Sequence, residues 1–560
     1  MAIAHVELMI QDPEVAEVKT IPITEGIDIA DEDFFLNGPV SRRAAVLDFD
    51  PSTGQLTPGA SYQPPAPGRL IGKYAPADPH NIYAADFMQI NVFGTVFNTI
   101  HMFERAENLG RRVQWGFDGP QLLVIPRAGR WENAFYERES RSLQFFYFEA
   151  DGRQIQTSLS RDIVAHETGH AILDGINPSL YDAITPQSLA LHEAIADLSA
   201  LFVALLSDDL REAVLDHSQL SIKESSAFSS IAEEFGKRLH PEKGGGPLRN
   251  LLNDLTMDDV RGDDPHELCN VVTGALYRVL VSIHEAYRQR YAEAGMAARP
   301  AAGKALALAG NKLRRMVIRG LDYLPPGDVS FADFGRAIIA ADTAAHPDND
   351  EERQWIIDQF VLRKMAPDEA AMREGTGDSS RKLEGADPQT LLESDWAAYQ
   401  FANQSDARRL LKIAPDVPFR VLPRLEARKT IFLGESKRGE THECLFKVAW
   451  DYTEPNAGGS VLPRFRHVTA GTTLVIDWDT GTVRARLSTD RSGQQRDGRD
   501  RMLLRLLDEG VIRVGRQALA TDGKPLRGAI QAARIGDTMQ VRGIARALHI
   551  AKPSDGTSAR

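Results

Sequence analysis

Cysteine is almost absent from this chain: Cys269 and Cys444 are the two thiols among 560 residues. Two cysteines so far apart cannot form the disulfide framework of a small secreted fold, and they favour a reducing compartment. The first residues, MAIAHVELMIQDPEVAEV, lack a basic segment followed by a sustained apolar one, so we expect no Sec signal. The protein is therefore expected in the cytoplasm, or exported by a route that cleaves no Sec signal.

Long hydrophobic runs are absent as well. The apolar stretch Leu198–Leu206 is among the longest, and it is too short to cross a bilayer as a helix, so no membrane span is expected. With 42% hydrophobic and 26% charged residues, the composition is typical of a soluble globular protein. A chain of 560 residues is too long for one ordinary core, so about two to four domains are expected.

Negative charge is scarce in the last part of the chain. Residues 401–560 contain 28 Lys and Arg against 18 Asp and Glu, a net charge of +10. Since the whole chain has a net charge of −13, residues 1–400 have −13 − 10 = −23. Such asymmetry indicates separate domains. The basic region could meet nucleic acid, anionic lipid or an acidic partner, although a solvated basic surface is the more common case. It contains no RNA- or DNA-binding motif, so nucleic acid is not expected as a partner.

Changes of pattern divide the chain into regions. Residues 1–75 are predicted to be a β-rich extension, either part of the next sheet or a small subdomain. Residues 76–160 are predicted to mix strands with one helix, and residues 161–365 to be mainly helical. Residues 366–400 are polar and rich in Gly, Asp and Ser, which is typical of a linker. Residues 401–560 return to strands. The expected fold class is α+β, with a separate basic, β-rich C-terminal domain.

The stretch Arg161–Gly175, RDIVAHETGHAILDG, contains the motif H-E-x-x-H at His166, Glu167 and His170. Positions four apart lie on one face of a helix, so the two imidazoles can bind one zinc ion. The intervening glutamate then lies beside the metal and can accept a proton from the water that the metal activates. The pattern predicts one Zn²⁺ per chain. The alternative is a surface helix with two solvated histidines.

The inner pair of this motif is Thr168-Gly169. A glycine inside a helix costs up to about 1 kcal/mol relative to alanine. We interpret Gly169 as a residue that allows close packing against another helix.

The next predicted helix, Ser188–Ser207, offers the third metal ligand. A zinc hydrolase needs three protein ligands and an open position. If this helix runs antiparallel to the first, Glu193 and Asp197 point together at the metal. Glu193 would ligate zinc, and Asp197 would hydrogen-bond the outer ring nitrogen of a ligand histidine. His192 lies on a different face and is interpreted as a structural neighbour.

Several motifs in the correct order resemble the thermolysin-like gluzincin zinc metallopeptidases, over roughly residues 80–365. That family has a helix of N-E-A-I-S-D type after H-E-x-x-H, and here His192–Asp197 reads HEAIAD. Its pattern H-x-x-S-x-x-x-N-x-A-x-Y is matched in spacing by His266–Tyr277, HELCNVVTGALY. Its edge-strand motif N-A-F-W corresponds to Asn133–Tyr136, NAFY. A metzincin is excluded, since Leu173 stands where that class needs glycine.

The resemblance implies a two-lobed catalytic domain over residues 76–365, with a β-rich lobe and a helical lobe. It also implies that His266 and Tyr181 stabilise the oxyanion. Asn133 and the backbone of Ala134 would bind the peptide as an added strand.

Further positions follow from the same resemblance. Arg249, in the pair Leu248-Arg249, would bind a substrate carbonyl. Asp263 or Asp264 should hold the histidine at 266. Asp162 matches one position of the family's calcium sites, but no other calcium ligand can be matched, so calcium is not predicted.

The expected function is that of a zinc metalloendopeptidase acting on a peptide or protein, with Glu167 as general base. Two alternatives remain open. One is a catalytically silent member of the fold that serves as a binding or scaffold module. The other is a recognition protein that acts mainly through its basic C-terminal domain.

Overall fold

A computed structural model describes the chain apart from residues 14–22, 32, 151, 225–227, 232–248, 261, 376–382, 384–386, 434–436, 458–461, 490–492, 515–529, 546–548 and 550–560. The fold is mixed α and β with several sheets, which confirms the α+β class. Among the described helices, none alone is long and apolar enough for a membrane crossing, and α4 and α5 reach that standard only as a pair bent by 91°.

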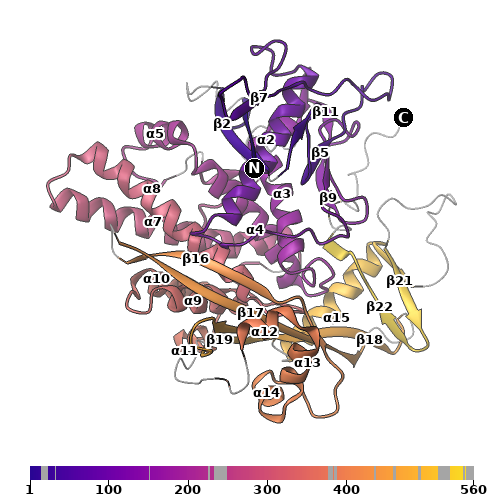
Figure 1. Ribbon diagram of the computed structural model, residues 1–560. Helices are drawn as coiled ribbons and strands as arrows, with labels where there is room; N and C mark the ends of the chain where they lie inside the picture. Colours follow the sequence, from indigo (N-terminus) through magenta and orange to yellow (C-terminus); the bar gives the residue numbers. More distant parts are fainter. Residues whose placement is uncertain are drawn as a thin grey trace.

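The helices whose bounds the structure describes lie between residues 85 and 508, and the region 161–365, predicted to be mainly helical, contains α3 to α5 and α7 to α10 (Figure 1). Their bounds are α2 Ala85–Glu104, η1 Thr157–Leu159, α3 Arg161–Ile176, α4 Pro186–Ala204, α5 Asp208–His217, α7 Pro265–Glu293, α8 Ala298–Tyr323, α9 Phe331–Ala345, α10 Glu351–Leu362, α11 Glu369–Arg373, α12 Pro388–Glu393, α13 Asp395–Asn403, α14 Ser405–Leu410 and α15 Gly493–Asp508.

The first sheet belongs to the N-terminal residues and has the order β2-β1-β7-β6. Strand β1 pairs antiparallel with β2 and parallel with β7. Helix α2 packs close to it: a β-carbon on Gly94 would come within 2.9 Å of the Val6 side chain. The strands are β1 Ala2–Met9, β2 Thr24–Asp31, β6 Tyr62–Gln63 and β7 Ile71–Tyr74.

The second sheet has six strands in the order β3-β4-β5-β8-β10-β9, so β9 is an edge strand. The segment 142–150, predicted as one strand, is two: β10 belongs to this sheet, whereas β11 pairs with β12. The strands are β3 Phe35–Leu36, β4 Val40–Ser41, β5 Ala44–Val46, β8 Leu122–Ile125, β9 Ala134–Glu137, β10 Ser142–Phe145, β11 Tyr147–Ala150 and β12 Arg153–Gln156.

The C-terminal region is built on the long antiparallel pair β17 and β18. In Figure 1 this sheet (orange to yellow) lies below helices α3, α4, α7 and α8, on the side opposite to the N-terminal sheets. The strands of this part are β15 Arg420–Val421, β16 Leu425–Leu433, β17 Lys437–Pro455, β18 Phe465–Asp477, β19 Val483–Ser488, β20 Ile512–Val514, β21 Ile530–Ile535 and β22 Thr538–Gln540. A short pair, β13 Ser230–Ile231 and β14 Arg249–Asn250, lies between α5 and α7.

The predicted linker 366–400 is described in part, because residues 376–382 and 384–386 lie outside the described residues. It contains α11, α12 and most of α13. With α14, the last two cover one face of the C-terminal sheet, where Phe401 packs edge-on against Phe446 at 5.3 Å between ring centroids.

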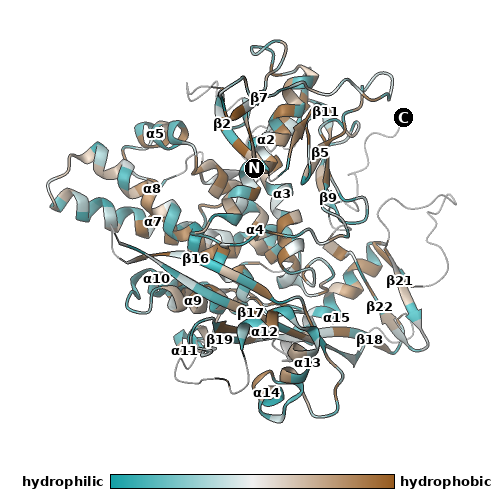
Figure 2. Ribbon diagram, in the orientation of Figure 1, coloured by the Kyte–Doolittle hydropathy of each residue, from teal (hydrophilic) through white to brown (hydrophobic). Residues whose placement is uncertain are grey.

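The two faces of the C-terminal sheet belong to different cores. Side chains alternate along a strand, so neighbouring residues point to opposite faces. Leu445 and Val475 join the main core with the helices, whereas Phe446 and Leu474 join the smaller core under α12 to α14. The main core is one cluster of buried side chains whose members come from all along the chain, from Ala4 to Ala545, and the elements around it show mixed apolar and polar positions (Figure 2).

Candidate metal centre

Helices α3 and α4 bring His166, His170 and Glu193 together in the interior, with their ligand atoms within 4.8 Å of one another. The two Nε2 atoms are 3.1 Å apart. Each lies 3.8 Å from one carboxylate oxygen of Glu193. All three residues are buried, so this group could hold a metal ion.

These distances fit zinc. Tetrahedral ligands at about 2.0–2.2 Å from the ion lie about 3.3–3.6 Å from each other. The observed separations of 3.1 to 3.8 Å bracket that range. Two imidazoles and one carboxylate are also a donor set that zinc hydrolases use.

The outer nitrogen of each histidine has a partner from α4. The Nδ1 atom of His166 lies 3.0 Å from Oδ1 of Asp197. The Nδ1 atom of His170 lies 2.6 Å from Nδ1 of His192, and the two rings stack with their centroids 4.8 Å apart. Such partners fix the ring orientation and the tautomer, so that Nε2 faces the ion.

Burial keeps the imidazole rings of His170 and His192 neutral. It lowers the pKa of His170 well below its usual value and the pKa of His192 to about 3. A neutral imidazole is the form that binds a metal. The role of His192 could not be found from the sequence, because helical spacing alone placed it on another face.

Glu167 lies beside this group, almost fully buried. Its Oε2 atom accepts a hydrogen bond of 3.1 Å from the backbone N–H of Tyr136 in β9. Burial raises the pKa of the Glu167 carboxyl. A carboxylate with a raised pKa and a fixed orientation is suited to accept a proton.

His266 lies in the first turn of helix α7 and faces the carboxylate of Glu193, with Nε2 3.7 Å from its Oε2 atom. Its other ring nitrogen lies 3.4 Å from Asp264, and Asp264 caps α7 by accepting 2.8 Å from the backbone N–H of His266. The hydrogen bond with the His266 side chain holds the pKa of Asp264 well below its usual range. Of the two aspartates considered from the sequence, Asp264 therefore holds His266, while Asp263 pairs with Arg501.

Tyr181 is buried, and its hydroxyl accepts a hydrogen bond of 3.3 Å from the backbone N–H of Arg138. The guanidinium of Arg138 lies over the same ring, 4.2 Å from its centroid. The hydroxyl hydrogen remains a donor in this arrangement, so its predicted role towards an oxyanion stays a prediction.

Of the predicted peptide-binding residues, Asn133 and Ala134 lie at the start of edge strand β9. The side chain of Asn133 accepts 2.9 Å from the backbone N–H of Ala134 and donates 2.8 Å to the carbonyl of His549. For Arg249, the structure describes the backbone in β14 but not the side chain, and Leu248 lies outside the described residues. Asp162, the matched calcium position, accepts a hydrogen bond from Gln11.

His549 is the residue of this site that sequence reasoning missed. Its Nε2 atom lies 2.9 Å from Oε1 of Glu193, and it forms a second ligand group with Glu193 and His266, within 4.8 Å. No local pattern marks this lone histidine near the end of the chain. It is brought here by the fold.

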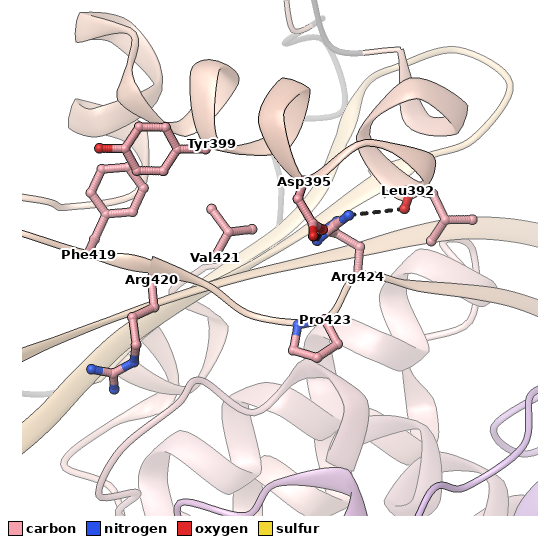
Figure 3. Close-up of a pocket in the computed structure, with 8 residues that line it drawn as sticks. All are labelled: Leu392, Asp395, Tyr399, Phe419, Arg420, Val421, Pro423 and Arg424. Atoms are coloured by element: carbon pink, nitrogen blue, oxygen red, sulfur yellow. Dashed lines mark hydrogen bonds and ion pairs between the residues drawn. The ribbon is translucent and has the colours of Figure 1, made fainter.

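A pocket of about 650 Å³ lies elsewhere, in the C-terminal region (Figure 3). Tyr399 and Phe419 stack along one side, with 5.0 Å between centroids, and Asp395 pairs with Arg424 at 2.7 Å. It shares no residue with the metal centre.

No family model and no curated protein matches the chain.

Proposed function

We propose that this protein is a zinc-dependent metalloendopeptidase of the thermolysin-like gluzincin type, with a β-rich lobe and a helical lobe on either side of the metal centre. The observation that carries the proposal is the buried group of His166, His170 and Glu193, with Glu167 beside it. When bound, the zinc ion would supply Lewis-acid activation of a water molecule and of the scissile carbonyl.

The remaining roles belong to side chains of the chain. Glu167 accepts the proton of the attacking water and passes it to the leaving amine. Its hydrogen bond from Tyr136 ties the base to strand β9, where the peptide would lie. His266, oriented by Asp264, donates to the oxyanion.

The substrate would bind as an extended peptide along β9. This strand is at the edge of its sheet, and edge strands recruit peptides through main-chain hydrogen bonds. The base and the peptide-binding strand are thus in direct contact, which is the geometry that peptide hydrolysis requires.

Metal content and cleavage of a peptide library test the proposal. The purified chain should contain about one zinc. Glu167→Gln should keep the zinc and reduce the cleavage rate by about 10²–10⁴-fold. Glu212→Gln, an exposed position on α5, is the matched control and should cleave like the wild type.

Two outcomes would contradict the proposed enzymatic function. Unchanged cleavage by Glu167→Gln would remove this mechanism. A zinc-containing chain that cleaves no peptide, either as wild type or in any variant, would favour a silent scaffold.

A further inference from the structure

The end of the chain returns to the metal centre. The backbone N–H of Gly543 donates 2.7 Å to Asp182, and the N–H of Ala545 donates 3.3 Å to the carbonyl of Tyr181. Between them, Ile544 is fully buried in the main core. These contacts fix the segment Val541–Ala545 against the loop that joins α3 to α4.

His549 then lies among the residues of the site. In addition to its contact with Glu193, its ring centroid is 5.0 Å from that of His170 and 5.9 Å from that of His266. Its carbonyl accepts the hydrogen bond from Asn133. One residue of the C-terminal segment therefore contacts a metal-ligand candidate, the oxyanion candidate and the peptide-binding candidate.

This set of partners is the set that a substrate peptide would need. Asn133 offers its amide to a main-chain carbonyl, as it would to a substrate. A segment tied to the same chain competes with free peptides at an effective concentration of about millimolar. Its contacts need not be strong to keep peptides out.

We infer that His549 is a fourth protein ligand of the metal and that Val541–Ala545 and His549 form a built-in occupant of the proposed peptide site, so that the full chain is latent. The inference rests on the proposed function. The 2.9 Å between Nε2 of His549 and Oε1 of Glu193 is close to the separation of about 3.3–3.6 Å between two ligands of one tetrahedral zinc ion. Four protein ligands are typical of closed, structural zinc sites, and three are typical of catalytic ones.

Metal binding can test whether His549 is a ligand without any cleavage assay. The full chain is loaded with Co²⁺, which replaces zinc and absorbs visible light according to its ligands. His549→Ala should change the Co²⁺ spectrum and lower the affinity, measured by chelator competition, by about tenfold or more. His80→Ala, at an exposed histidine on a loop, should match the wild type in both measurements.

A second variant displaces the segment and leaves the histidine in place. Gly543 has φ +69° and donates its N–H to Asp182. Proline cannot adopt that angle and has no N–H, so Gly543→Pro should reproduce the spectral change of His549→Ala. Circular dichroism should show the same folded content in all variants.

Peptide cleavage separates the two claims. Both His549→Ala and Gly543→Pro should cleave a peptide library faster than the wild type, by about tenfold or more if the segment competes at millimolar effective concentration. Identical Co²⁺ spectra and affinities in wild type and His549→Ala would show that His549 is not a ligand of the metal. If the wild type is active and both variants cleave at the same rate as the wild type, the claim that the C-terminal residues occupy the peptide site is wrong. A changed spectrum without cleavage in any variant would instead overturn the proposed function and leave the ligand standing.

Discussion

Gly169 of α3 faces Ser199 of α4 so closely that a β-carbon on the glycine would come within 2.6 Å of the serine hydroxyl. It would also lie 3.1 Å from the backbone of Ala196. The interpretation of Gly169 as a close-packing residue is thus confirmed. Since His170 follows directly, this contact also sets the distance between the two helices that carry the ligands.

Gly169→Ala is expected to destabilise the protein by about 1–3 kcal/mol, because overpacking displaces side chains or backbone. The measurement is the midpoint of thermal or urea unfolding. Gly303→Ala in α8 is the control, since nothing lies within 4 Å of its β-carbon position. It should stabilise by about 0.5–1 kcal/mol, because alanine is the better helix former. Equal shifts in both variants would contradict the packing argument.

Asp197→Asn is expected to lower zinc affinity by about 10–100-fold. The carboxylate 3.0 Å from His166 makes the ring a better ligand and holds its orientation. The amide keeps the size of the side chain but loses its charge. Chelator competition measures the affinity, and an unchanged value would show that this contact does not tune the metal.

His192→Phe tests the partner of the second ligand. The stacked ring is retained, while the 2.6 Å contact with His170 is lost. Zinc affinity should again fall by about tenfold, whereas the unfolding midpoint of the metal-free protein should change little. A loss of stability with unchanged affinity would assign His192 a packing role alone, as the sequence suggested.

Lys447→Met tests a buried charge far from the site. The ammonium group donates 3.1 Å to the carbonyl of Leu324, and burial lowers the pKa of Lys447 to about 8. That carbonyl also accepts 2.8 Å from Thr473, so it keeps a partner in the variant. The variant should be more stable at pH 7 by about 1–3 kcal/mol, because no charge is then buried.

The sign of the pH dependence follows from the lowered pKa. Between about 8 and the unfolded value of about 10.4, the unfolded state binds more protons than the folded one. The contribution of Lys447 to stability therefore rises with pH across this window. The advantage of Lys447→Met should shrink accordingly when unfolding is measured at pH 7 and at pH 10. A constant difference would show that Lys447 is not the group that titrates.

Local spacing was enough to find the metal group. His166 and His170 lie on one helical face, and Glu193 and Asp197 follow on the next helix at the same interval, so regular helix geometry places them. The hydrogen bond between His170 and His192 needed the relative rotation of two packed helices, which spacing within one helix does not give.

The sequence was less informative where contacts are long-range. The break between β10 and β11 depends on which partner strand each half finds, and a continuous apolar pattern hides it. His549 is the extreme case, since 356 residues separate it from Glu193. A single histidine carries no periodicity, so its place depends entirely on how the last strands pack.

The main core also determines how late in synthesis the fold can be completed. A ribosome makes the chain from its N-terminus, and the ligands on α3 and α4 are complete early. Yet the core around these helices also includes Val475, Met539 and Ile544, which are made late. The last of these precedes His549 by five residues. A nascent chain therefore completes its core at nearly the moment it makes His549, so the inferred C-terminal occupant would be in place as soon as the core that supports the metal centre is complete.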